Sequence, residues 1–267
     1  MLRNLINCFF AFLVSGSAHA DTQFLSFAPT YLPSYAGFGV GSYNQYLGSD
    51  ESSLGFAPFG RYSFGEQKYV ALQANYVTVN LLEDVNWRVG PAGVYRFGRS
   101  DVDDPVIDLL PEVDGSLDLG AFVSYEYAHS DPRNRWGIGA AFLHGVEGAN
   151  DGYTVSINAR RWLPVGEFSL LGLFGGITYG SSGYMDTYFS VTPEGANMSG
   201  LPVFEAGSGV RDLRLGAVFI QPLSREWQVG AGVLYYRLYE DAADSPIVST
   251  QGDRNQIAYG FGVNRAF

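Results

Sequence analysis

Several stretches of this chain alternate between apolar and polar or small residues with a period of two. From Leu117 to Tyr127 the odd positions are apolar or aromatic, whereas the even positions, apart from Phe122, are small or polar. The C-terminal stretch 256–267 repeats this pattern. Because a β-strand turns successive side chains to opposite faces, each stretch has one apolar wall and one polar wall. Such strands fit a membrane barrel, with lipid outside and a polar lumen inside; the alternative is an edge strand of a soluble protein.

Strand-like segments continue along most of the chain. Besides the two stretches above, they occupy 36–43, 54–64, 69–82, 87–97, 136–144, 153–162, 168–179, 211–221 and 227–239. This makes eleven strands, whereas single-chain bacterial barrels have an even number. The weaker segment Thr22–Tyr31 is the natural twelfth strand, and ten strands result if a weak N-terminal pair does not cross the membrane. We therefore predict an all-β fold, a transmembrane antiparallel up-and-down β-barrel of about 12 strands (10 possible).

The N-terminal residues have the features of a secretory signal peptide. Arg3 provides the positive start, 5–14 form an apolar run, and Ala18-His19-Ala20 is a small-x-small cleavage site. We therefore expect a signal peptide at 1–20 and a single barrel domain at 21–267. Cys8 is the only cysteine and lies in the segment removed, which excludes disulfides and thiol chemistry from the mature chain. No stretch approaches the roughly 20 apolar residues of a membrane-spanning helix, which excludes a helical inner-membrane protein.

Composition supports the barrel and argues against nucleic-acid binding. The chain has 16 Lys+Arg against 27 Asp+Glu, a net charge of −11, and nucleic-acid binding requires clustered positive charge. Losing Arg3 with the signal peptide takes the mature chain to −12. The sequence contains 34 Gly, 18 Tyr and 19 Phe, yet its mean hydropathy is +0.00. Neutral hydropathy with many aromatic residues is typical of strands that alternate between lipid and water.

The four tryptophans predict how the barrel is oriented. Trp87, Trp136, Trp162 and Trp227 all flank short connections, and the long connections 99–114, 181–209 and 240–254 contain none. Bacterial barrels have short periplasmic turns, long outer loops and aromatic girdles at both interfaces. We therefore expect the four tryptophans to form a periplasmic belt; the alternative is that they are scattered core aromatics.

Charged residues fall on the wall predicted to face the lumen. If the apolar wall of each strand faces lipid, the charged side chains that point into the lumen are those of Arg88, Arg96, Asp118, Glu126, Arg160, Asp212 and Arg214. Mixed charges of this kind either form an ion-pair network that fills a closed barrel or line a small pore. A barrel of about a dozen strands is narrower than the open porins, and we favour a mostly plugged lumen.

Five sequence blocks resemble the MipA/OmpV family, also called MltA-interacting proteins. They are Tyr46-Leu47-Gly48-Ser49-Asp50; Gly90-Pro91 with Tyr95-Arg96-Phe97-Gly98-Arg99; Tyr188-Phe189-Ser190-Val191; 200–204; and 238–248, which contains Ser245-Pro246-Ile247-Val248. The chain departs from the family pattern at Asn44 and Ser190, which affects fine loop geometry. The chain's end also resembles the closing strand of outer-membrane proteins, in which the terminal Phe is implied to be read by the insertion machinery.

The resemblance implies a role and a set of partners. It implies a non-enzymatic outer-membrane scaffold, in contact with lipid and lipopolysaccharide, that joins a lytic transglycosylase to a penicillin-binding murein synthase. Other members of this broad family are linked to adhesion, osmotic response or antibiotic susceptibility. The alternative function, from a different class, is a channel or transporter for a small polar solute. The oligomeric state stays open.

Catalytic and metal-binding patterns are weak in this sequence. His144, near Glu147 and Asp151, is the one histidine of note for a hydrolase, since His129 lies in an expected periplasmic turn. Neither a Gly-x-Ser-x-Gly elbow nor an HExxH motif occurs. The acidic loops 101–114 and 240–253 lack the spacing of a calcium loop and fit a solvated surface or contact with cation-bridged lipopolysaccharide. We therefore assign no catalytic residue, metal ligand or cofactor; a barrel hydrolase using His144 is the third hypothesis.

Overall fold

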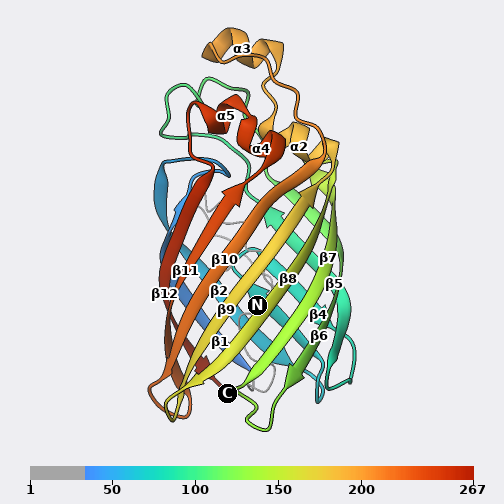
Figure 1. Ribbon diagram of the computed structural model, residues 1–267, viewed down its shortest axis with the longest axis vertical. Coiled ribbons are helices and arrows are strands. Elements are labelled where there is room, and N and C mark those ends of the chain that lie inside the picture. Colours follow the sequence, from blue (N-terminus) through green and yellow to red (C-terminus); the bar gives the residue numbers. More distant parts are fainter. Residues whose placement is uncertain (1–33) are drawn as a thin grey trace, which may run out of the picture.

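The alternating stretches form the wall of a closed antiparallel barrel in the computed structural model, which describes residues 34–267 (Figure 1). Each strand pairs with its neighbours in sequence, and β1 closes the sheet against β12. The predicted up-and-down barrel of 12 strands is confirmed. The strands are β1 (Tyr35–Asn44), β2 (Ser52–Ser63), β3 (Tyr69–Gln73), β4 (Tyr76–Asn80), β5 (Trp87–Arg96), β6 (Ser116–Ala128), β7 (Arg135–Gly148), β8 (Tyr153–Val165), β9 (Ser169–Gly180), β10 (Gly209–Pro222), β11 (Trp227–Leu238) and β12 (Asn255–Ala266).

The twelfth strand arises differently from the sequence-based expectation. The stretch 69–82, expected as one strand, is the hairpin β3–β4, in which Gln73 pairs with Tyr76 across a tight turn. Ala74 in this turn has a φ of 51°, and the Asn75 side chain donates a hydrogen bond to the Tyr95 carbonyl at 2.7 Å. The expected signal peptide and the expected strand Thr22–Tyr31 lie outside the described residues.

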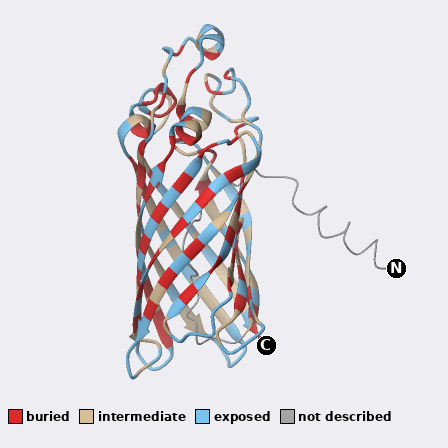
Figure 2. Ribbon diagram, turned by 90° about the vertical axis from the view of Figure 1, so that its right-hand side faces the viewer, coloured by how far each residue is buried: buried red, intermediate tan, exposed pale blue. Residues whose placement is uncertain are grey.

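The two faces of the barrel differ as the alternation predicts (Figure 2). On β6, Asp118, Ser124 and Glu126 are buried, while Leu119 and Val123 on the opposite face are exposed. The terminal strand behaves alike, with Gln256 buried and its large apolar side chains exposed. Large exposed apolar side chains line the outside of a barrel only if hydrocarbon surrounds it. The wall is therefore built for lipid outside and for polar groups inside.

Three of the four tryptophans lie where the sequence places them. Trp87, Trp136 and Trp227 are between 40% and 47% exposed at the end with the short turns, and Tyr125 contacts both Trp87 and Trp136. The prediction for Trp162 is wrong, because its side chain is fully buried and packs edge-on against Phe174 at 5.5 Å. The reason is strand phase: on β8 the even-numbered positions face inward. The belt therefore has three members, and Trp162 fills the lumen.

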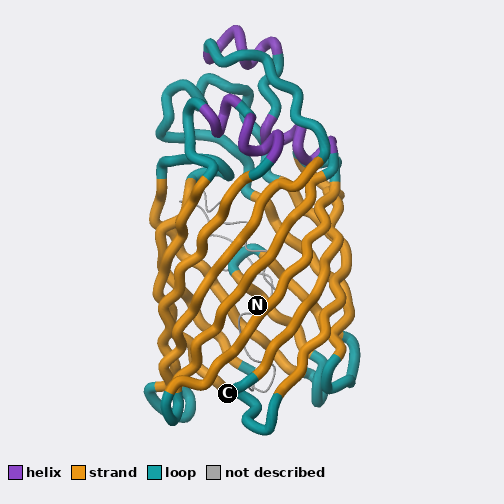
Figure 3. The backbone as a smooth tube through the Cα atoms, viewed as in Figure 1, coloured by secondary structure: helices purple, strands orange, loops and turns teal. Residues whose placement is uncertain are grey.

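The connections divide into two kinds, which orient the molecule (Figure 3). Short turns join the strands at the end that carries the C-terminus, and the long connections gather at the other end (Figure 1). Four helices lie in two of these long connections: α2 (Ser182–Phe189), α3 (Pro193–Ser199), α4 (Glu240–Asp244) and α5 (Pro246–Ser249). Among residues 34–267, no helix has the length and apolar character needed to cross a membrane. By the usual rule for these barrels, the short turns are periplasmic and the helices outside the cell.

Candidate functional site: a charged lumen under an outer cap

The seven charged residues predicted to face inward all do so. Each is at most 7% exposed. Six of them form three groups of ion pairs at two levels of the lumen, whereas Arg88 donates hydrogen bonds to backbone carbonyls, such as those of Asp84 and Val85. Near the periplasmic end, Glu126 of β6 accepts hydrogen bonds from Arg135 and, at 2.6 Å, from Arg160. Because each carboxylate oxygen meets a different guanidinium, Glu126 cross-links β6, β7 and β8 on their inner face.

Two further groups lie toward the outer end of the lumen. Arg96 Nε is 2.5 Å from Asp118 Oδ2, and Asn150 donates to the other oxygen of Asp118 at 3.0 Å. Across the barrel, Asp212 is held between Arg211, at 2.5 Å, and Arg214, at 3.1 Å. All the members of these pairs are at most 5% exposed. A buried charge is tolerated only when it is paired and hydrogen-bonded, and both carboxylates meet this condition.

Several of the buried charged residues inside the barrel were not predicted from the sequence. Arg135 lies just before the expected strand 136–144 but is the first residue of β7. Arg211 and Asp212 are neighbours that both face inward, because a register shift between β9 and β10 falls between Val210 and Asp212. Alternation alone puts neighbours on opposite faces, so such a bulge cannot be read from it. Arg61 is also buried and lies 4.0 Å over the Tyr69 ring; the inward phase of β2 was a usable signal for it.

The interior is cationic although the whole chain is acidic. Eight arginines are buried among the described residues, against three carboxylates, whereas the chain carries a net charge of −11. The arginines are Arg61, Arg88, Arg96, Arg99, Arg135, Arg160, Arg211 and Arg214, and the carboxylates are Asp118, Glu126 and Asp212. The electrostatic environment inside the barrel therefore favours anions.

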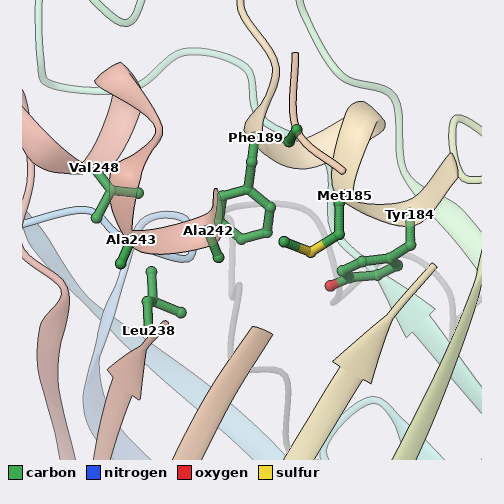
Figure 4. Packing of buried hydrophobic residues seen from close by; sticks show 8 residues of the cluster. Tyr184, Met185, Phe189, Leu238, Ala242, Ala243 and Val248 are labelled. Carbon is green, nitrogen blue, oxygen red and sulfur yellow. The ribbon is translucent and has the colours of Figure 1, made fainter. Parts of the chain in front are cut away.

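The long connections pack together into an outer cap, formed by the segments 45–51, 97–115, 181–208 and 239–254. Within it, Met185 and Phe189 of α2 point toward Ala242 of α4, and Leu238 at the end of β11 completes the packing (Figure 4). A second apolar cluster joins Tyr46, Ile107 and Ile247 from three different segments of the cap. Such packing gives the long loops a core of their own, and the cap is therefore an ordered structure at the outer mouth of the barrel.

Parts of all five sequence blocks that resemble the MipA/OmpV family lie in this cap, although Gly90-Pro91 and Tyr95-Arg96 of the second block belong to β5. Gly48 has a φ of 101°, and a Cβ there would lie 2.3 Å from a Val248 methyl group, so only glycine fits between the two blocks. The Ser245 hydroxyl donates to the Phe189 carbonyl at 2.6 Å, and Val191 pairs with Phe204. Tyr184 of α2 connects the cap to the lumen, because Arg96 and Arg211 both stack on its ring.

The histidine considered for catalysis is not assembled into a catalytic group. His144 is exposed on the outward-facing side of β7, and its Nδ1 lies 2.6 Å from the Gly145 carbonyl oxygen. Within the described range, no hydrogen bond or ion pair joins it to Glu147 or Asp151. His129 lies in the periplasmic turn, as expected, and packs edge-on against Tyr127 at 5.3 Å. Residues 34–267 also contain no group of three or more His, Cys, Asp or Glu side chains arranged to hold a metal ion.

A closed twelve-stranded barrel with lipid-facing apolar residues and a charged, capped lumen defines an outer-membrane β-barrel protein. The family model described as MltA-interacting protein MipA matches residues 36–267, and the chain belongs to this family. Among curated proteins it is similar to outer membrane protein OmpV of Vibrio cholerae serotype O1, 31% identical over 113 residues, or 42% of this chain and 43% of that protein. It is also similar to outer membrane protein Omp26La of Vibrio anguillarum, 30% identical with the same coverage.

These matches span less than half the length of the curated relatives. Among solved structures, the NanC porin is 9% identical with a TM-score of 0.49, covering 88% of this chain and all of that one. OmpT of Vibrio cholerae is 8% identical with a TM-score of 0.41, covering 91% of this chain and 99% of that one. The family, the named relatives and the barrel topology place the protein in the outer membrane.

Proposed function

We propose that this protein is a non-enzymatic interaction protein whose periplasmic rim binds murein-remodelling enzymes, foremost a lytic transglycosylase and through it a penicillin-binding murein synthase. The observation that carries the proposal is the closed lumen: an ordered cap covers the outer mouth, and buried ion pairs occupy the interior below it. A barrel closed in this way is suited to display a surface. The description of the matching family model, MltA-interacting protein, supports a murein enzyme as the partner.

The periplasmic rim consists of short turns stiffened by exposed charged contacts. Arg133 pairs with Asp131 at 2.9 Å and donates to the Glu167 carbonyl at 2.6 Å, which ties two neighbouring turns together. Arg133 lowers the pKa of the Asp131 carboxyl through this side-chain hydrogen bond. Glu226 pairs with Arg265 of β12 at 2.9 Å and fixes a third turn. A preordered charged rim loses little entropy when a partner binds.

Charge reversal on the rim tests the interaction. In the Arg133→Glu variant we expect capture of the lytic transglycosylase from gently solubilised envelopes to fall several-fold, since the change breaks the link between two turns and places like charges together. The readout is the amount of enzyme recovered after crosslinking in intact envelopes. Arg254→Glu, in the outer cap, is the matched control and should capture as much enzyme as the native protein. Recovery of no murein enzyme by the native protein would contradict the proposal.

The second candidate function is a channel for a small anionic solute, favoured by the excess of buried arginines. We expect the native protein to show conductance near background in planar bilayers, because the cap and the ion pairs obstruct the lumen. High, anion-selective conductance that is abolished by the bulky substitution Arg96→Trp, in protein shown to be folded by its gel mobility, would favour the channel instead.

A further inference from the structure

A small cavity lies between the outer cap and the top of the barrel. It has a volume of about 40 Å³ and is lined by Tyr46, Leu47, Asn75, Arg96, Arg99 and Tyr188, among others. Asn75 is at the tip of the β3–β4 hairpin, whose strands have five residues each while the other strands have ten to fourteen. The cavity thus lies where the wall is shortest. Three of the blocks shared with the family contribute to its lining.

Arg99 makes this cavity chemically distinctive. Its side chain is only 9% exposed, and its guanidinium makes one long hydrogen bond, 3.5 Å, to the Tyr188 carbonyl. No ion pair in the described part of the chain includes it, whereas the neighbouring Arg96 is paired with Asp118. Burial lowers the pKa of Arg99, but a guanidinium stays protonated in proteins. A buried cation without a counter-ion among the described residues carries a large desolvation penalty, which a bound anion would offset.

A second buried polar group supplies a hydrogen-bond donor. The Tyr46 hydroxyl has no hydrogen-bond partner among residues 34–267, although the side chain is only 5% exposed. Burial raises the pKa of Tyr46, so its hydroxyl stays protonated and able to donate. The walls beside these groups are largely aromatic and apolar, including Leu47, Phe97 and Tyr188. The site therefore combines one unpaired positive charge with a neutral donor and an apolar lining.

Charge and geometry select among anions. A water molecule needs about 10–15 Å³ of such space, so the cavity has room for roughly three waters, enough to admit a small polar group. A single unpaired guanidinium balances one negative charge, and its planar fork matches a carboxylate in two-point geometry.

We propose that this cavity binds the carboxylate group of a small organic acid, held by Arg99 with the Tyr46 hydroxyl as a second donor. The site is independent of the scaffold function, because it lies at the outer end of the barrel, away from the periplasmic rim. Arg96 of the lumen also lines the cavity, but Asp118 already balances its charge, so Arg99 supplies the charge that attracts the acid. Arg99 is the binding residue, and the aromatic walls accept the methyl or short alkyl part of the acid.

The test uses acetate as the probe and the full-length mature protein folded in a neutral detergent. Binding of ¹³C-labelled acetate is followed by NMR saturation transfer, with chloride and phosphate as competitors at constant ionic strength. We expect saturable binding in the native protein and at least about tenfold weaker binding in Arg99→Gln, because removal of a charged hydrogen-bond donor is the dominant loss. Arg237→Gln, which changes an outer-end arginine that does not line the cavity, should bind as the native protein does.

Two further results decide the chemistry. Arg99→Lys keeps the charge and loses the two-point geometry, and we expect it to bind acetate several-fold more weakly than the native protein. If Arg99→Gln fails to fold, as judged by heat-dependent gel mobility, Arg99→Lys takes its place as the test variant. Absence of saturable binding in the native protein, or native affinity in a folded Arg99 variant, overturns the proposal. Equal competition by phosphate overturns the assignment to a carboxylate.

Discussion

Replacing Glu126 with glutamine is expected to lower the free energy of unfolding of the barrel by about 3–5 kcal/mol. Glu126 is 3% exposed and is the carboxylate shared by Arg135 and Arg160. Glutamine keeps the size of the side chain but removes the negative charge, which leaves two buried guanidinium groups without a counter-ion. Removal of one partner from a buried ion pair costs far more than the pair itself contributes, because the remaining charge stays desolvated.

The measurement is a urea titration of the protein in lipid vesicles, followed by tryptophan fluorescence. Glu226→Gln is the matched control: Glu226 pairs with Arg265, but both side chains are more than half exposed, so water screens the loss and the change should stay below about 1 kcal/mol. Equal effects of the two substitutions would show that the ion pairs around Glu126 do not hold the lumen together.

Replacing Trp162 with alanine is expected to cost about 3–5 kcal/mol, the range for removing a large aromatic side chain from a packed interior. Trp162 is fully buried and packs against Phe174 and Leu170 in the lumen. The protein around it cannot collapse into the space, because both neighbours are fixed on strands of a closed sheet. Unfolding in urea, with the midpoint compared between variants, measures the loss.

Trp136→Ala is the control, since Trp136 is 40% exposed on the outer wall and lipid can fill the space that it leaves. A second readout separates the two positions directly. In variants that retain a single tryptophan, brominated lipid should quench the fluorescence of Trp136 strongly and that of Trp162 weakly. Strong quenching of Trp162 would mean that it faces lipid, as the simple belt hypothesis requires.

Individual residues show where the alternation of side chains along a strand predicts the inward and outward faces correctly. It placed Arg88, Asp118 and Glu126 correctly inside the barrel, because burial alternates without a break through their positions in β5 and β6. It failed where a local feature changed the phase. The reversal in 69–82 is visible in hindsight, since Tyr69 and Ala71 face inward at odd positions while Tyr76 faces inward at an even one.

The amino-acid sequence by itself determined the class of protein: an outer-membrane barrel, the orientation of its wall and most of the charges inside it. These follow from side-chain direction along a strand, which is a local property. Only the tertiary structure decided which charges pair, where a bulge turns Arg211 inward, and that the long connections pack into a cap in which Arg99 has no counter-ion among the described residues. Those features depend on contacts between segments far apart in the chain, such as Gly48 with Val248, and local alternation carries no information about them.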